Sequence, residues 1–298
     1  MRVSDVVRLL RPKQWSKNLL VFAALLFSGK LGDRHADLLA LIAFIAMCLM
    51  SSALYMANDA LDAPQDRLHE KKRDRPIAAG RIPAMAAWIV APLLAAWALY
   101  LAWTVNLACG QTVLAYFVLQ ALYNAAFKRL AVADVFSIAL GFVLRAVVGA
   151  AAISVPISGW LLFCTGALAL MLGFGKRRAE LMQAGEEASA TRESLAHYRL
   201  QAIEAMLIVS AGSAAMSFGV YSIDSSTARH YPALILTSLF VFYGIYRYLF
   251  LVFAQNRGDE PEALIADPHI LTVLVLFVVA AALAVGGWHV PFLDSPIQ

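Results

Sequence analysis

Nine apolar runs recur along the whole sequence, and no long soluble segment separates them. A transmembrane helix needs about 20 apolar residues, or somewhat fewer where it is tilted or kinked. We place the runs at 18–29, 37–57, 84–105, 110–127, 132–153, 159–174, 203–223, 231–254 and 269–289. Because a helix satisfies its own backbone hydrogen bonds in lipid, each run is expected to be helical. The sequence therefore predicts an all-α, multi-pass membrane protein with nine transmembrane helices.

The composition supports this class. Hydrophobic residues make up 61% of the chain and charged residues 15%, against about a quarter charged in ordinary soluble domains. Cys48, Cys109 and Cys164 lie within or at the ends of the runs, without the paired spacing of a metal site or disulfide framework. We treat residues 1–298 as one membrane domain.

Two stretches near the N-terminus each have two competing interpretations. The run at 18–29 could be a signal peptide, but no small-residue cleavage site follows it and further runs come after. Residues 3–15 mix apolar and basic side chains, as expected of a helix lying in the membrane interface. A basic anchor for the first run explains the same residues equally well.

The basic residues predict the orientation. They precede the first run and follow the second, fourth, sixth and eighth, whereas only Lys30, Arg34 and Arg229 lie in the alternate loops. The positive-inside rule then puts the N-terminus and the long polar loops in the cytoplasm, with the C-terminus outside the inner (plasma) membrane. The net charge of +4 reflects this topology, so no nucleic-acid partner is needed to explain it.

An acidic cluster follows the second run. Asn58, Asp62 and Asp66 are spaced i, i+4, i+8 and stack on one helical face, with Asp59 beside them. Like charges at this spacing repel unless cations lie among them. Oxygen ligands suit Mg²⁺, which binds through one or two carboxylates plus substrate phosphates. The pattern predicts a diphosphate clamp; the alternative is a solvated loop whose acids pair with nearby Arg and Lys.

Basic residues lie just downstream of the acids. Lys72, Arg73 and Arg75 come before Pro76, and Gly80 permits an unusual turn. This arrangement would fold the basic residues back over the acidic helix, where guanidinium groups suit phosphate oxygens. Their alternative role is to set the topology.

A second charged cluster follows the sixth run. It contains Lys176, Arg177, Arg178 and Glu180, with Lys176 and Glu180 on one helical face. Four runs separate the two clusters, so a pseudo-repeat of two four-helix halves plus a ninth helix would place them face to face. The second cluster is either a phosphate receptor or a plain i, i+4 ion pair.

Polar residues also occur inside the runs. A charge at mid-bilayer costs at least about 2.5 kcal/mol, yet Arg145 lies well inside the fifth run. Asp134 and Arg145 fall near one stripe of that run, and Asn124 shares a face with Lys128. These residues predict a polar pocket open to the cytoplasm. Arg145 could instead pair structurally with Asp134 or with a helix-end carbonyl.

The chain resembles the UbiA superfamily of intramembrane prenyltransferases. Asn58, Asp59, Asp62 and Asp66 match its N-D-x-x-D-x-x-x-D motif in full. The resemblance covers nearly the whole chain and implies nine helices around a central cavity, with two polar loops after helices two and six.

Within the superfamily, the chain looks most like the decaprenyl-phosphate phosphoribosyltransferase branch. The shared stretches are "LRPKQWSKNLLVFA" at 10–23, "RPIAAG" at 75–80, "DV…GFVLR…G" at 134–149 and "GKR..EL" at 175–181. A Tyr-to-Lys stretch matches through Tyr123 and Lys128, although Asn124 replaces the more usual Ser. Aromatic-prenylating relatives carry a second Asp-rich motif where this chain has Lys176, Arg177 and Glu180.

The resemblance implies transfer of phosphoribose from phosphoribosyl diphosphate to a long polyprenyl phosphate, with Mg²⁺ as cofactor. Asp62 and Asp66, supported by Asn58 and Asp59, would hold Mg²⁺ on the donor diphosphate. Lys176 and Arg177, with Arg178 as a further candidate, would grip the 5-phosphate, and Glu180 would bind a ribose hydroxyl. The further binding candidates are Lys17, Arg73, Arg75, Tyr123, Lys128, Asp134 and Arg145.

Two other functions fit parts of the sequence. Ordinary prenyl transfer from a prenyl diphosphate is the alternative within enzymes, and the basic second cluster argues against it. A transporter would explain buried Arg145 and Asp134, but its charges would be spread over both membrane sides. A homo-oligomer is compatible with the sequence, which leaves the oligomeric state and the length of the lipid tail open.

Overall fold

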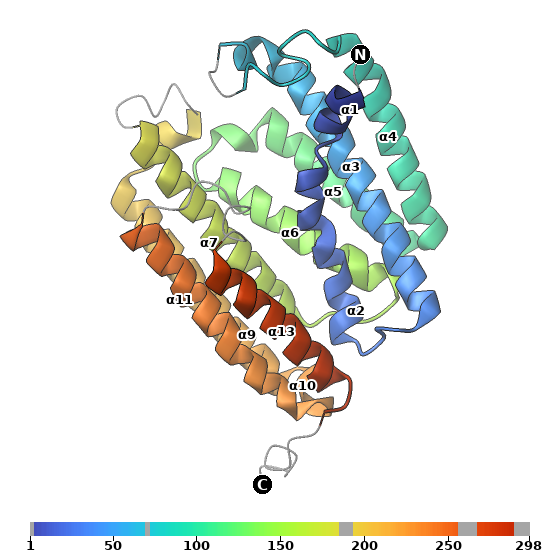
Figure 1. The fold of residues 1–298 in the computed structure, drawn as a ribbon, viewed down its shortest axis with the longest axis vertical. Coiled ribbons are helices and arrows are strands. Elements are labelled where there is room, and N and C mark those ends of the chain that lie inside the picture. Colours follow the sequence, from blue (N-terminus) through green and yellow to red (C-terminus); the bar gives the residue numbers. More distant parts are fainter. Residues whose placement is uncertain (1–2, 69–71, 185–192, 256–266, 289–298) are drawn as a thin grey trace. The chain divides into compact units, whose positions relative to one another are not determined.

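The computed structural model describes residues 3–68, 72–184, 193–255 and 267–288, and the regular structure in these ranges is helical (Figure 1). The all-α prediction is confirmed. The elements are α1 (Val3–Leu10), η1 (Pro12–Phe22), α2 (Ala23–Phe27), α3 (Arg34–Asp66), α4 (Ala84–Val105), α5 (Leu107–Ala125), η2 (Phe127–Arg129), α6 (Ala133–Ala152), α7 (Gly159–Ala184), η4 (Glu193–His197), α9 (Leu200–Asp224), α10 (Ser226–His230), η5 (Pro232–Thr237), α11 (Ser238–Ala254) and α13 (Pro268–Val285).

Seven helical stretches in the described residues are long and apolar enough to cross a membrane. They are Arg34–Asp66, Ala84–Val105, Ala133–Ala152, Gly159–Gln183, Leu200–Asp224, Pro232–Ala254 and Pro268–Val285. Each corresponds to one predicted run, and the run predicted at 84–105 coincides with α4. The chain is therefore a multi-pass membrane protein.

The other two predicted runs, 18–29 and 110–127, are not among these seven stretches. Residues 18–29 comprise the end of the 3-10 helix η1 and the five-residue α2. The run at 110–127 lies on α5, where Gln111, Gln120 and Asn124 lower the mean hydropathy of a 19-residue helix. Among the described residues, neither run meets the length and hydropathy that the seven spans meet.

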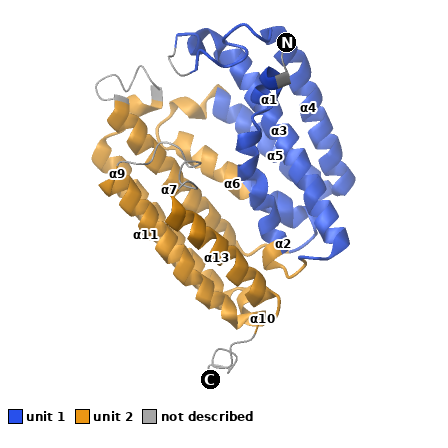
Figure 2. Ribbon diagram, viewed as in Figure 1, with its two compact units in different colours: residues 1–25, 31–124, 144–155 blue, residues 26–30, 125–143, 156–298 orange. Residues whose placement is uncertain are grey.

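The chain divides into two compact units, coloured separately in Figure 2. Unit 1 comprises residues 1–25, 31–124 and 144–155, and unit 2 comprises residues 26–30, 125–143 and 156–298. The acidic cluster on α3 belongs to unit 1, whereas the charged cluster on α7 belongs to unit 2.

Small side chains dominate the core of unit 1. Helices α3 and α4 pack together, and Ala43, Ala46, Ala98 and Ala102 are fully buried there. Small residues let helix backbones approach closely in a membrane, where packing and not water exclusion drives association. The alanines of these two helices therefore set their close contact.

Gly149 on α6 lies very close to the backbone of η1. A Cβ atom at this position would lie 1.9 Å from the backbone oxygen of Val21, so the backbone itself would have to move. We expect Gly149→Ala to lower the free energy of unfolding by about 1–3 kcal/mol, the usual cost of overpacking. Thermal unfolding in detergent measures this loss. Gly212→Ala is the control, because nothing lies within 4 Å of its Cβ position; equal stability of the two variants would contradict the prediction.

The core of unit 2 forms where α7 packs along α9. Met171 and Phe174 of α7 meet Ile203 and Leu207 of α9, and Tyr248 of α11 closes the cluster. This packing continues to the charged end of α7. The polar residues that follow Phe174 are thus held on a rigid helix.

Candidate functional site

The acidic motif forms the last turns of α3, which continues as one helix through Asp66. The predicted helical spacing of Asn58, Asp62 and Asp66 is therefore present. Asp59 and Asp66 are only 2% and 4% exposed. A buried carboxylate is tolerated only when it is paired and hydrogen-bonded, so these two acids require cationic partners.

Arg75 supplies one of those partners. Its Nη1 lies 3.1 Å from Asp59 Oδ1 and 2.6 Å from Asp66 Oδ2. The loop that carries it turns at Gly80, with φ +72°, and Arg67 Nε donates to Ala78 O at 3.2 Å. The loop thus folds back over the acidic helix, as the sequence predicted for Arg75. Arg73, predicted to do the same, is exposed.

Arg11 is a member of this cluster that sequence reasoning did not select as a site residue. Its Nη2 lies 2.5 Å from Asp59 Oδ1, and its guanidinium carbon lies 4.9 Å from the centre of the Tyr55 ring. Arg11 stands between α1 and η1 in a left-handed conformation, with φ 52° and ψ 57°. The sequence signal that could have identified Arg11 is its position before Pro12, within the 10–23 stretch that the chain shares with the decaprenyl-phosphate phosphoribosyltransferase branch.

The acidic cluster has oxygen donors of the kind that Mg²⁺ prefers. The buried Asn58 Oδ1 accepts no hydrogen bond from any part of the chain that the structure describes. Among residues 3–68, 72–184, 193–255 and 267–288, no three His, Cys, Asp or Glu side chains converge tightly enough to hold a metal by themselves. The donor set therefore fits a Mg²⁺ ion that takes one or two carboxylates, with the Asn58 oxygen beside them, and completes its shell with substrate phosphates and water.

Arg145 lies in a buried polar network of unit 1 and is 5% exposed. Its Nε donates to Asn18 Oδ1 at 2.8 Å, and its Nη2 donates to Tyr116 OH at 2.8 Å. Asn18 Nδ2 in turn lies 3.4 Å from Ser51 Oγ. The network ties η1, α3, α5 and α6 together, which explains how a charge is accommodated inside a membrane-spanning helix.

Lys17 and Tyr123 also belong to unit 1. Lys17 Nζ donates to Gln14 Oε1 at 2.5 Å, and Tyr55 OH lies 3.4 Å from the same oxygen. Tyr123 is half-buried near the end of α5. Gln14 thus links Lys17 to Tyr55, whose ring lies beneath the Arg11 guanidinium group.

In unit 2, Asp134 is completely buried at the start of α6. It accepts hydrogen bonds from Arg177 Nε at 2.7 Å, Ser194 Oγ at 3.1 Å and Tyr198 OH at 3.0 Å. Burial raises the pKa of Tyr198, so its hydroxyl stays protonated and able to donate. The same hydroxyl accepts from Val132 N, whose residue has a strained φ of 68°. Asp134 therefore fixes the chain before α9 against the start of α6.

Arg177 connects Asp134 to Glu180. Its side chain is 2% exposed, and its Nη1 lies 2.5 Å from Glu180 Oε2. The sequence spacing suggested Lys176 as the partner of Glu180, but the structure pairs Glu180 with Arg177, three residues before it. Lys176 and Lys128 are half-buried. Arg177 is enclosed by its own chain, whereas the Glu180 side chain remains 24% exposed.

Arg178 joins three helices of unit 2. Its Nε lies 2.8 Å from Glu204 Oε1, and its Nη1 donates to Val252 O at 2.9 Å. Its guanidinium carbon lies 5.0 Å from the centre of the Phe253 ring. Through these contacts, Arg178 holds the C-terminal part of α7 against α9 and α11.

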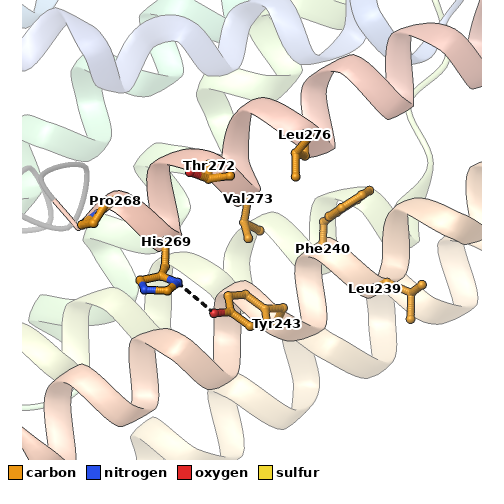
Figure 3. A pocket seen from close by; sticks show the side chains of 8 residues that line it. All are labelled: Leu239, Phe240, Tyr243, Pro268, His269, Thr272, Val273 and Leu276. Atoms are coloured by element: carbon orange, nitrogen blue, oxygen red, sulfur yellow. Dashed lines mark hydrogen bonds between the residues drawn. The ribbon is translucent and has the colours of Figure 1, made fainter.

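A surface groove lies between α11 and α13 (Figure 3). It is lined by Leu239, Phe240, Tyr243, Pro268, His269, Thr272, Val273 and Leu276. Tyr243 OH lies 3.2 Å from His269 Nδ1 at its polar end. The other walls are largely apolar and suit contact with lipid chains more than phosphate chemistry.

These features define a class: an all-helical, multi-pass membrane protein with clusters of carboxylates and guanidinium groups at the ends of its helices. The profile of the UbiA prenyltransferase family matches residues 19–266, and the chain belongs to this family. It is accordingly a transferase enzyme of the membrane.

Relatives and solved structures agree with this assignment. The chain is 34% identical over 92% of its length to decaprenyl-phosphate phosphoribosyltransferase of Mycolicibacterium smegmatis, of which 90% is covered. The Mycobacterium tuberculosis protein of the same name is 33% identical over 74% of the chain and 75% of its own length. A UbiA homolog from Archaeoglobus fulgidus, solved bound to GPP and Mg²⁺, superimposes with a TM-score of 0.73 at 18% identity, covering 95% of this chain and all of that one.

Proposed function

We propose that the enzyme transfers 5-phosphoribose from phosphoribosyl diphosphate to a polyprenyl phosphate such as decaprenyl phosphate, releasing diphosphate. The observation that carries this proposal is the match, over most of the chain, to relatives named decaprenyl-phosphate phosphoribosyltransferase. The half-buried Lys176 on α7 also favours a donor that carries an additional phosphate.

In this proposal the acidic cluster receives the diphosphate of the donor. Asn58, Asp62 and Asp66 would hold Mg²⁺, which supplies Lewis-acid neutralisation of the charge that develops on the diphosphate. Arg75 balances the buried charge of Asp66 and has a guanidinium fork suited to a phosphate. Arg73, exposed in the same loop, is a further candidate for phosphate contact.

The second cluster is assigned to the phosphoribosyl group. Lys176 would bind the 5-phosphate, and Glu180 would accept a hydrogen bond from a ribose hydroxyl. Arg177 holds Glu180 from its buried side and is itself held by Asp134. In this proposal, Arg177 therefore orients Glu180 and does not itself bind the 5-phosphate.

The chemistry is a substitution at the anomeric carbon of the donor. An oxygen of the polyprenyl phosphate forms the new bond to that carbon, while the bond to diphosphate breaks and the diphosphate leaves with its electron pair. The attacking phosphate is already anionic, so no general base is required. Lys17, Tyr123 and Lys128 are the candidates for contact with the acceptor head group, and nearby carboxylates would stabilise the positive charge that develops on the sugar.

We further propose the topology that the sequence predicts. Nine helices would cross the inner membrane around a central cavity, with residues 18–29 and α5 completing the seven spans described above. The N-terminus and the active site would face the cytoplasm and the C-terminus the outside, and residues 1–298 would form one domain. Cysteine-accessibility labelling of spheroplasts at Ser4 and Ser154, each replaced by Cys in a cysteine-free variant, tests the two sides.

Product analysis tests the reaction. The purified protein in detergent would receive labelled phosphoribosyl diphosphate, decaprenyl phosphate and Mg²⁺, and in parallel geranyl diphosphate with an aromatic acceptor. We expect a phosphoribosylated lipid by mass spectrometry from the first mixture and no new product from the second. A prenylated aromatic product without phosphoribosylated lipid would replace this proposal with ordinary prenyl transfer.

A further inference from the structure

The corner between α1 and η1 is held firmly against α3. Ser52 Oγ donates to Leu10 O at 2.8 Å and accepts from Trp15 Nε1 at 3.0 Å. The two anchored residues lie on either side of Arg11, whose left-handed backbone is uncommon for a residue other than glycine. Strained conformations of this kind persist where the surrounding structure enforces them, and they gather at functional sites.

The enforced backbone directs Arg11 onto the acidic end of α3. Asp59 Oδ1 accepts from both Arg11 Nη2, at 2.5 Å, and Arg75 Nη1, at 3.1 Å. One carboxylate oxygen therefore holds two guanidinium groups together, although their charges repel. Arg11 also lies over the Tyr55 ring, which limits its freedom further.

Exposure differs sharply within this group. The side chains of Asp59 and Asp66 are 3% and 5% exposed, whereas those of Arg11 and Arg75 are 23% and 27% exposed. The carboxylates thus lie inside and the guanidinium groups outside. An incoming ligand meets paired cationic forks before it meets the acids, and such forks recognise phosphate oxygens.

We propose that Arg11 and Arg75 form a paired guanidinium receptor for a diphosphate group, and that Asp59 is the positioning residue that holds the pair. This inference goes beyond the proposed function, because it adds Arg11 as a binding residue and gives Asp59 a role other than metal ligation. It holds for any diphosphate donor, so its test does not depend on which group the enzyme transfers.

Calorimetric binding of inorganic diphosphate to the full-length protein in detergent, with EDTA and separately with Mg²⁺, tests the proposal. We expect Arg11→Gln to weaken binding about tenfold, as loss of a charge-assisted hydrogen bond does. Arg11→Lys keeps the charge without the fork and should give an intermediate affinity. Arg81→Gln is the matched control: it removes one positive charge from the same unit, where Arg81 pairs with Asp5 at 2.9 Å, and should bind as the parent does.

Asp59→Asn separates positioning from simple electrostatics. Loss of a negative charge near an anion site should by itself tighten diphosphate binding, whereas loss of the residue that orients both guanidinium groups should weaken it. We expect weaker binding, by about threefold or more, in a variant whose thermal unfolding remains cooperative. Tighter binding by Asp59→Asn, or affinity within twofold of the parent for Arg11→Gln, would overturn the receptor.

Discussion

Replacement of Asp66 by alanine is expected to reduce transfer at least about a thousandfold, equivalent to about 4 kcal/mol of transition-state stabilisation. Asp66 is buried at the end of α3 and pairs with Arg75 at 2.6 Å. Its removal takes away a predicted Mg²⁺ ligand and leaves Arg75 without one of its two acidic partners. The rate of lipid phosphoribosylation, measured over a range of Mg²⁺ concentrations, gives the effect.

Asp62→Ala should behave similarly, because Asp62 lies one helical turn before Asp66. The control is Asp74→Ala, which removes an exposed carboxylate from the neighbouring loop and should leave transfer unchanged. Cooperative thermal unfolding of each variant shows that the protein remains folded. Full activity of Asp62→Ala or Asp66→Ala would show that the acidic cluster does not hold the donor diphosphate through Mg²⁺.

Replacement of Asp134 by alanine should have the largest effect on stability. The completely buried carboxylate accepts hydrogen bonds from Arg177, Ser194 and Tyr198. Its loss removes the buried acidic partner of Arg177 and leaves Glu180, which is 24% exposed, to balance that buried charge. Breaking a buried ion pair from one side costs about 3–5 kcal/mol. Chemical or thermal unfolding in detergent measures this change.

An exposed ion pair provides the matched control. Asp224 and Arg229 lie 2.8 Å apart with side chains 60% and 71% exposed, and such pairs contribute at most about 1 kcal/mol. Asp224→Ala should therefore change stability little. The double variant Asp134→Leu with Arg177→Met should be more stable than Asp134→Ala, because it removes both buried charges together. Equal stability of Asp134→Ala and Asp224→Ala would show that Asp134 does not anchor this region.

The membrane-spanning architecture was largely predictable because hydropathy is a local property of the chain. The run at 84–105 coincides with α4, and the acidic motif continues α3 as the helical spacing of Asn58, Asp62 and Asp66 required. The helix type of the first run, 18–29, was harder to predict, since Pro12 begins a 3-10 helix and α2 is only five residues long. Helix type at such a chain corner depends on anchoring contacts such as those of Ser52.

The partners of the charged residues were less predictable. Sequence spacing suggested Lys176 for Glu180, but the enclosed Arg177 bonds both Glu180 and Asp134, which lies 43 residues away. Arg73 and Arg75 looked equivalent in the sequence, yet only Arg75 is placed on Asp59 and Asp66 among the contacts of the described residues. Arg11 reaches Asp59 across 48 residues.

The sequence by itself determined the helical membrane class, the position of the acidic motif on a helix, and the family, because these follow from hydropathy, periodicity and local motif. The tertiary structure decided which guanidinium group meets which carboxylate. Ion pairing inside a membrane protein depends on which side chains packing shields from water and lipid, and that selection joins residues far apart in the chain.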